Sequence, residues 1–338
     1  MTKLCKLSLI LATFLFGSTL YAQDVHFSQF NSNPIYLNPA LSGLNNCNYR
    51  LAANYKRQWG GVANFQTIAA SYDMNMLKRN RKSNFAGFGI SLFNDRAGDI
   101  SLSNTKVDIS LAYSLVLNPS GTQFLTFALK GGVGHRSFDM SKVTTDSQFG
   151  ADGFNSGLST QENFATDSKV YGDVGAGLLW SLTQRNSNNY YLGFAVTHLN
   201  QPNISFFNDR DEQLYIKATL HGGASFKLNN QLGLMPSFMF LNQGPHNQLN
   251  VGGLVKIRKS IVPSDQTAFY IGGWYRLQDA VILSARVDWK DINIGFSYDI
   301  NLSKLTPATN LNGGPEVSLI YTGCLSNKKN QSVYCPAL

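Results

Sequence analysis

One ten-residue stretch, Asp291 to Ile300, alternates between apolar and polar side chains without a break. Its even positions are all aliphatic or aromatic, and its odd positions hold two aspartates, an asparagine, a serine and a glycine. Successive side chains of a strand point to opposite faces, so one face of this strand suits lipid and the other a polar interior. A chain that repeats this pattern around a ring is typical of a membrane β-barrel with a polar lumen.

The same alternation predicts about fourteen strands between Tyr49 and Thr322, an even number as in bacterial single-chain barrels. The expected strands are 49–58, 65–74, 85–93, 104–117, 123–134, 170–182, 190–198, 213–228, 232–241, 250–258, 268–277, 281–289, 291–300 and 315–322. Composition agrees, because only 14% of the residues are charged, against about 25% in a soluble domain. We therefore predict an all-β transmembrane antiparallel barrel over residues 49–322.

The first 22 residues are typical of an export signal. Lys3 and Lys6 precede an apolar run from Leu7 to Leu20, and Ala22 ends a plausible cleavage site. An N-terminal membrane anchor is the alternative, but a run of about 14 residues is shorter than the roughly 20 that a spanning helix needs. We expect residues 1–22 to be a cleaved signal peptide and the mature chain to reside in the outer membrane.

The lengths of the connections predict the orientation of the barrel. Long polar connections are expected at 136–169, 199–212 and 301–314, and tight turns at 118–121, 229–230 and 290–291. Barrels of the outer membrane keep short turns on the periplasmic side and long loops outside. We place both termini, including a tail at 323–338, on the periplasmic side. A basic turn at 78–82 is interpreted as a solvated turn or as a contact with an envelope partner.

Residues 23–48 precede the barrel and lack strand alternation. Pro34 and Pro39 each follow an asparagine, which favours turns. The segment is expected either to enter the lumen as a plug or to lie on the periplasmic rim.

Three cysteines follow the signal, Cys47, Cys324 and Cys335, and an exported chain meets an oxidising compartment. Cys47–Cys324 would join the first and last strands, whereas Cys324–Cys335 would close a short C-terminal loop. Spacing alone does not choose between these pairs, and we favour a bridge that includes Cys335.

Catalytic and metal-binding motifs are missing from the sequence. It contains no nucleophile elbow, zincin motif, phosphate-binding loop or dinucleotide fingerprint, and its five histidines are far apart. The net charge of +8 is spread over turns and expected lumen positions, which argues against nucleic acid as a partner. We expect no enzyme activity, no cofactor and no metal.

The order of three motifs resembles one family, that of PorP/SprF proteins. The first is QDVHFSQFNSNPIYLNPALSG at 23–43, the second is NYKRQW at 54–59 with Phe65 and Ser71-Tyr72-Asp73, and the third is Cys335-Pro336. The family usually ends in a basic and an aromatic residue, where this chain has Ala337 and Leu338. The motif positions that carry the N-terminal resemblance are Phe27, Ser28, Gln29, Pro34, Leu37, Asn38, Pro39, Ala40 and Gly43.

The resemblance implies an outer-membrane barrel of Bacteroidetes that works with the type IX secretion system and with gliding motility. Its implied partners are secretion components and a large secreted adhesin, which the barrel would bind and anchor, or help deliver, through the adhesin's C-terminal domain. The expected contacts are aromatic residues of the long loops, because aromatic side chains dominate binding hot spots. They are Phe149, Phe154, Phe164, Phe206 and Phe207. The alternative hypothesis is an outer-membrane transport barrel for a small hydrophobic molecule.

Overall fold

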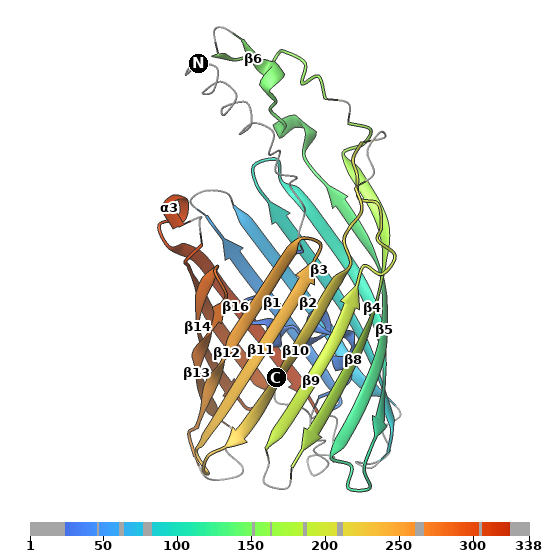
Figure 1. Ribbon diagram of the computed structural model, residues 1–338, viewed down its shortest axis with the longest axis vertical. Coiled ribbons are helices and arrows are strands. Elements are labelled where there is room, and N and C mark those ends of the chain that lie inside the picture. Colours follow the sequence, from blue (N-terminus) through green and yellow to red (C-terminus); the bar gives the residue numbers. More distant parts are fainter. Residues whose placement is uncertain are drawn as a thin grey trace, which may run out of the picture.

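Fourteen antiparallel strands close into a single barrel (Figure 1). The computed structural model describes residues 24–45, 47–60, 64–76, 83–150, 153–162, 164–184, 188–207, 212–260, 267–303 and 306–324. The barrel strands are β1 Tyr49–Gln58, β2 Phe65–Met76, β3 Phe85–Ala97, β4 Leu102–Val116, β5 Gln123–Ser137, β8 Ser168–Thr183, β9 Asn189–Thr197, β10 Lys217–Lys227, β11 Leu232–Gln243, β12 His246–Arg258, β13 Ala268–Arg276, β14 Ala280–Trp289, β15 Ile292–Asn301 and β16 Asn312–Gly323. The predicted fold and strand number are confirmed.

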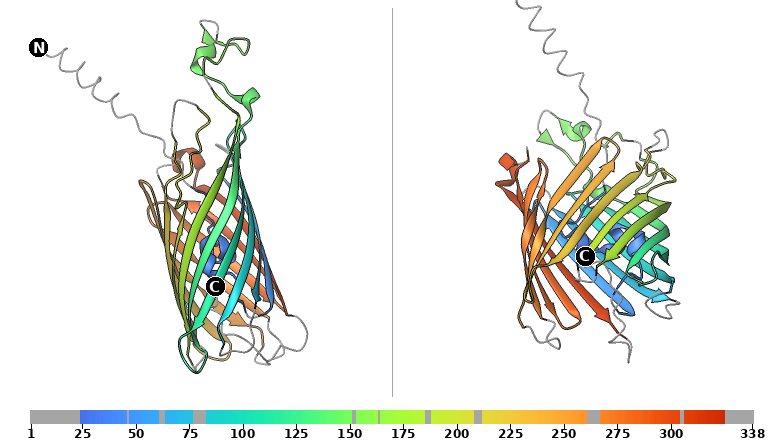
Figure 2. Two further views of the ribbon diagram at one scale, coloured as in Figure 1. Left: turned by 90° about the vertical axis from the view of Figure 1, so that its right-hand side faces the viewer. Right: turned by 60° about the horizontal axis from the view of Figure 1, so that its bottom comes forward.

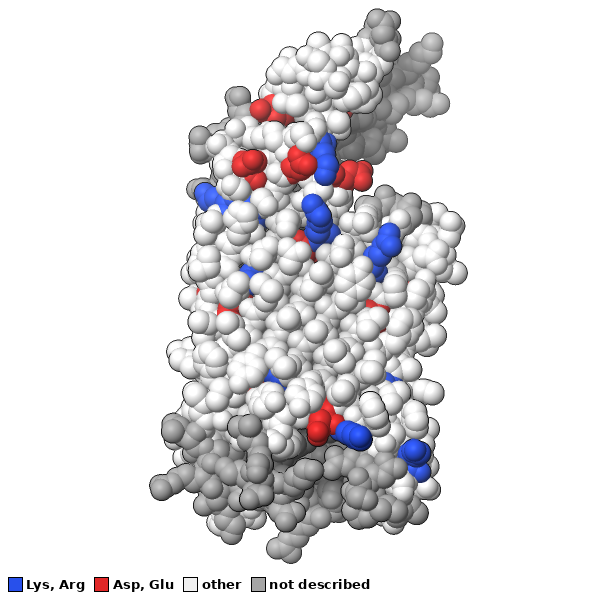
Figure 3. All heavy atoms as spheres, turned by 180° about the vertical axis from the view of Figure 1, so that it is seen from behind, with Lys and Arg blue, Asp and Glu red and all other residues white. Residues whose placement is uncertain are grey.

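Alternation of side chains sorts each strand into an outer and an inner face. In β15, Ile294 and Phe296 are exposed on the outside, whereas Ser297 and Asp299 are buried on the inside. Asp291 lies in the turn before the strand rather than on its inner face. On the face seen in Figure 3, the outer wall carries few charges, and most charged side chains lie toward the two ends of the barrel. An apolar wall between polar ends is the surface that a bilayer requires.

One predicted strand is shortened at its start, because β10 begins at Lys217 and not at Gln213. The intervening chain leaves the wall, and Leu214 packs with Ile204 and Tyr171 in a small buried cluster. Leu214 is therefore buried against protein, although its apolar character and even position made it resemble a lipid-facing residue.

The two ends of the barrel differ, as the connection lengths predicted. One end, the long-loop mouth, bears the connections 138–167, 198–216 and 302–311, and the other, the short-turn mouth, bears turns such as 290–291. Strands β6 (Phe149–Gly150) and β7 (Gly153–Phe154) form a small hairpin within 138–167. This connection extends well beyond the barrel at the top of Figure 1, and we call it the arm. The basic turn expected at 78–82 lies outside the described residues.

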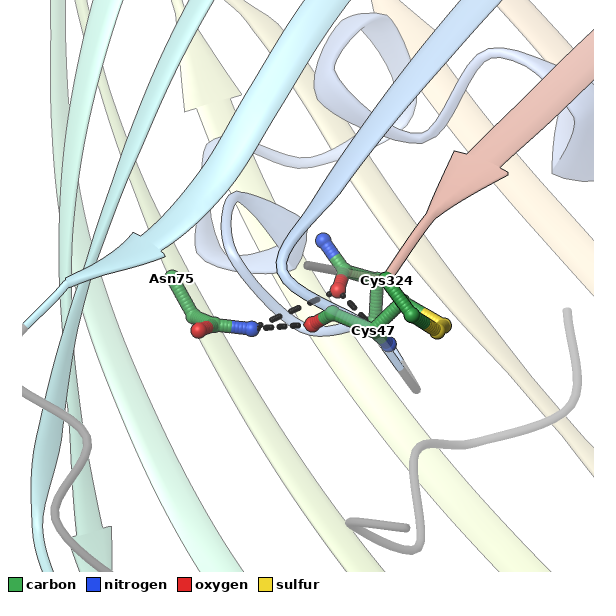
Figure 4. The surroundings of a disulfide bond; sticks show 4 residues. Cys47, Asn75 and Cys324 are labelled. Atoms are coloured by element: carbon green, nitrogen blue, oxygen red, sulfur yellow. Dashed lines mark hydrogen bonds between the residues drawn. A yellow bond between two sulfur atoms is a disulfide. The ribbon is translucent and has the colours of Figure 1, made fainter. Parts of the chain in front are cut away.

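The barrel closes where β1 pairs with β16, from Tyr49 opposite Gly323 to Lys56 opposite Glu316. Cys47 and Cys324 flank this pairing at the short-turn mouth and form a disulfide, with their Cα atoms 4.6 Å apart. The preference for a bridge with Cys335 was wrong, because strand register brings the residues just outside Tyr49 and Gly323 together. Figure 4 shows the disulfide beside Asn75, whose side-chain amide donates to the Cys47 carbonyl.

The described helices are short. They are η1 Phe30–Ser32, α2 Pro34–Leu37, η2 Pro39–Leu41, η3 Met140–Lys142, η4 Asp146–Gln148 and α3 Thr306–Thr309. Within the described part of the chain, no helix is long and apolar enough to cross a membrane.

Candidate functional site: a filled lumen and a projecting arm

Residues 24–45 cross the inside of the barrel, and we call them the lumen segment. Both views of Figure 2 show their short helices within the ring of strands. The segment begins at the long-loop mouth, where the Asp24 backbone N–H donates to Gln243 at the end of β11. It leads to Cys47 at the short-turn mouth. The placement of both termini on the periplasmic side therefore does not fit the start of the described chain, since the segment traverses the lumen before β1 begins.

At the long-loop mouth, Asp24 is held by three basic side chains. Its Oδ2 lies 2.8 Å from Lys217 Nζ, 2.9 Å from His198 Nε2 and 3.7 Å from Lys106 Nζ. The other ring nitrogen of His198 lies 2.9 Å from Asp173 Oδ1. Residues from β4 and β10, with His198 just after β9, thus converge on one carboxylate of the lumen segment, and Asp173 of β8 contacts two of them.

Ser28 and Gln29 bind the strands on either side of the barrel closure. Their backbone N–H groups donate to the two carboxylate oxygens of Glu316, at 2.7 and 3.0 Å. The Ser28 hydroxyl donates to Asp299 at 2.6 Å and accepts from Lys56 at 2.9 Å. All five residues are buried. Because removing one member of a buried charged network leaves its partners unpaired, this contact ties the segment strongly to the wall.

Asn38 and Gly43 make further polar contacts deeper in the lumen. The Asn38 side-chain amide donates to the Leu178 carbonyl at 3.1 Å and lies 3.0 Å from His221 Nε2. Its side-chain carbonyl oxygen accepts from the Ala40 backbone N–H. Asn38 thereby caps the η2 helix, whose first residue is Pro39. The Gly43 N–H donates to Asp73, which also pairs with Arg50 at 2.9 Å.

Apolar packing fills the space between these polar contacts. Phe30, Leu37, Leu41 and Leu44 join a buried cluster with large side chains of the wall, including Phe85, Phe124, Leu179 and Trp274. Phe27 lies edge-on against Tyr36, which stacks on Phe93 at 5.2 Å. All nine motif residues predicted for this region are buried in the lumen segment: Phe27, Ser28, Gln29, Pro34, Leu37, Asn38, Pro39, Ala40 and Gly43.

The wall has glycines where the segment comes closest. A Cβ added to Gly87 of β3 would collide with the backbone carbonyl of Ser42, and one added to Gly177 of β8 would collide with the Asn38 side chain. The segment also turns at Gly43, whose φ of +74° favours glycine. Neither approach was visible in the sequence, because the alternation pattern does not reveal which lumen positions face a neighbour of the same chain.

The five aromatic residues predicted for the loops separate into two groups. Phe149 and Phe154 face each other across the β6–β7 hairpin, 5.4 Å between ring centroids, and are 61% and 48% exposed. Phe164, Phe206 and Phe207 instead belong to an aromatic cluster at the base of the arm, centred on Phe138. Phe206 is buried there beneath Arg136. Of the five predicted residues, only the hairpin pair offers a broad apolar surface. Phe138 is a member of the cluster at the base of the arm that the sequence analysis did not identify.

The base of the arm is an ordered structure. Asp139 caps the η3 helix, because its side chain accepts hydrogen bonds from the backbone N–H and the hydroxyl of Ser141. The Ser141 hydroxyl and the Lys142 ammonium hold the pKa of Asp139 below its usual value. Residues Thr145 and Gln148 form a capping box at η4. The hairpin is therefore attached to the barrel through an ordered base.

Among the described residues, no group of three or more His, Cys, Asp or Glu side chains could hold a metal ion. The charged residues of the lumen are instead committed to contacts with one another and with the lumen segment.

Comparison with curated proteins finds no match. Among solved structures, the fold is similar to one described as the CymD monoaromatic hydrocarbon channel, with a TM-score of 0.50 and 8% identity over 90% of this chain and 96% of that one. BamA from Haemophilus ducreyi lacking POTRA domains 1–3 gives a TM-score of 0.44 and 8% identity, covering 82% of this chain and 70% of that one. At these identities the likeness concerns the barrel fold alone.

The match to a family model includes both the lumen segment and nearly all of the barrel. The family model described as "Type IX secretion system membrane protein PorP/SprF" matches residues 19–321. That range includes the N-terminal motif and all but the end of the last strand. The expected resemblance is confirmed, and the chain belongs to the PorP/SprF family of type IX secretion system membrane proteins.

Proposed function

We propose that this barrel binds a large secreted surface protein, an adhesin of the gliding machinery, through that protein's C-terminal domain, and anchors it at the cell surface or helps deliver it there. The family and the barrel fold support an outer-membrane location, with the long-loop mouth toward the cell exterior. The proposal assigns the barrel a binding role and no catalytic one, with other type IX components as further partners.

The observation that carries the proposal is the arm. It extends beyond the barrel and holds the exposed Phe149–Phe154 pair on an ordered base. Exposed aromatic side chains are unfavourable in water and are enriched at the centres of protein interfaces. The filled lumen supports the same role, because a barrel packed with its own lumen segment suits a docking platform better than a conduit for protein.

Surface display of the secreted partner tests the proposal. In cells that carry the double variant Phe149→Ser and Phe154→Ser, we expect the adhesin to appear in the medium or remain inside, and to be lost from the surface. Met140→Ser is a matched control, since Met140 is 40% exposed in the same connection but outside the hairpin. Barrel abundance in the outer membrane must be equal in all strains. Normal display of every large secreted adhesin in the double variant would overturn the proposal.

The alternative, transport of a small hydrophobic molecule, requires a path through the barrel. The apolar cluster and the ion pairs around the lumen segment occupy that path. Planar bilayer recordings separate the two functions. We expect no conductance from the complete protein, whereas steady conductance or saturable uptake of an apolar ligand would favour transport.

A further inference from the structure

A pocket with both polar and apolar lining residues opens beside the lumen segment at the long-loop mouth. It measures about 720 Å³, within the roughly 300–1,000 Å³ typical of ligand sites. Its walls come from the start of the lumen segment, from the ends of β1, β11, β12, β13 and β15, and from their connections. The pocket lies in the barrel mouth, and neither exposed phenylalanine of the arm lines it.

The charges at this pocket are already balanced. Three lining residues are charged apart from two histidines: Asp24, Arg276 and Asp279. Asp24 is paired with Lys217 at 2.8 Å, and Arg276 pairs with Asp279 and with Asp299, both at 3.1 Å. A charged ligand would have to compete with these pairs, so the pocket favours a neutral one.

The remaining chemistry is that of side-chain amides and an indole. Five amides line the pocket: Gln58, Asn247, Gln248, Gln278 and Asn301. An amide both donates and accepts hydrogen bonds, as does each hydroxyl of a sugar. Trp59 and the leucines of the lining supply apolar surface suited to the C–H faces of a sugar ring.

Two further observations concern the residues that line this pocket. Trp59 and Gln278 hold left-handed backbone conformations, with φ of 49° and 58°, and such strain in residues other than glycine collects at functional sites. Four buried nitrogens of lining residues also have no hydrogen-bond partner among the residues that the structure describes: Trp59 Nε1, His26 Nε2, His246 Nε2 and Arg276 Nε. Unpaired buried polar atoms are costly, and a ligand with several oxygens would satisfy them after small side-chain movements.

We propose that this pocket binds a neutral oligosaccharide of two or three sugar units at the outer mouth of the barrel. The site is separate from the arm, so the test of sugar binding is independent of the test of adhesin anchoring.

Calorimetry and tryptophan fluorescence on the purified full-length barrel test this proposal, in a detergent without a sugar headgroup. The probes are maltotriose, cellotriose and mannotriose. We expect at least one to bind with a Kd of about 1 mM or tighter and to change the tryptophan emission. Trp59→Phe should abolish the emission change, whereas Trp289→Phe, a control at the short-turn mouth, should retain it.

Two amide variants test the residues of the pocket. Gln248→Ala and Gln278→Ala should each weaken binding about fivefold, the usual effect of losing one net hydrogen bond. Gln231→Ala, at an exposed turn of the opposite mouth, should leave binding unchanged. Three results would overturn the proposal. They are no binding of any probe at 10-fold above that Kd, binding that neither amide variant weakens, and binding of a neutral extended peptide in place of the sugars.

Discussion

Lys56 on β1 and Asp299 on β15 form a buried ion pair, Nζ to Oδ2 3.4 Å, on either side of the strand that closes the barrel. Ser28 of the lumen segment accepts from Lys56 and donates to Asp299, and Lys56 also donates to the His26 carbonyl at 3.1 Å. The same lysine thus connects the wall on both sides of the closure to the segment inside.

Lys56→Ala should loosen the segment and the closure together. It removes the buried cation that Asp299 and Glu316 share, with Arg276 remaining beside Asp299, and breaking such a buried pair typically costs roughly 3–5 kcal/mol. Lys142→Ala removes an exposed pair with Asp139, which solvent screens, and should leave the unfolding midpoint nearly unchanged. Urea unfolding of the two variants in detergent measures the difference. Equal midpoints would show that the buried network does not hold the barrel together.

Gly87→Ala should displace the lumen segment while leaving the strands paired. The new Cβ would meet the Ser42 backbone carbonyl, and backbone cannot swing aside as the end of a side chain can. Gly131→Ala is the control, because nothing lies within 4 Å of its Cβ position. Limited proteolysis should cut residues 24–45 in the first variant and not in the second. Equal protection in both would mean that the segment does not rest on β3.

Cys47→Ser should destabilise the barrel by roughly 2–4 kcal/mol, since the disulfide joins residues 277 apart in the sequence and restrains the unfolded chain. Electrophoresis of samples incubated at a series of temperatures should show the folded band lost at a lower temperature than in the unmodified protein. Cleavage mapping of the unmodified protein without reductant should recover Cys47 and Cys324 in one linked peptide pair. Recovery of Cys324 linked to Cys335 would contradict the pairing.

The path of the lumen segment predicts which side of the membrane its start occupies. An epitope inserted between residues 23 and 24 should be detected by antibody on intact cells, because Asp24 lies at the long-loop mouth. An epitope between Lys290 and Asp291, in a turn of the opposite mouth, should be detected only after permeabilisation. The reverse result would show that the barrel has the opposite orientation.

Strand alternation was sufficient to predict the wall, because one side of every strand meets lipid and the other meets protein. It failed where that condition failed. Leu214 is apolar and even-numbered, yet it leaves the wall to pack on Ile204. Alternation also did not reveal what fills the lumen, since Asp299 and Glu316 would look the same in an open pore as beside Ser28.

The candidate site was likewise predicted only in part from the sequence. The N-terminal motif was recognised from its resemblance to the family, but the contacts of Asn38 and Gly43 with β8, β10 and β2 join residues far apart in the sequence. Among the loop aromatics, composition could not separate the buried Phe206 from the exposed Phe149. Only the packing of the arm's base distinguishes them.

Photocrosslinking from the arm tests anchoring most directly. A photoreactive phenylalanine analogue at position 149 or 154, in living cells, should yield an adduct that mass spectrometry identifies as the C-terminal domain of a large secreted surface protein. The same analogue at position 206, which is buried at the arm's base, should yield no such adduct. Normal display of the adhesin without any adduct from either hairpin position would contradict the account.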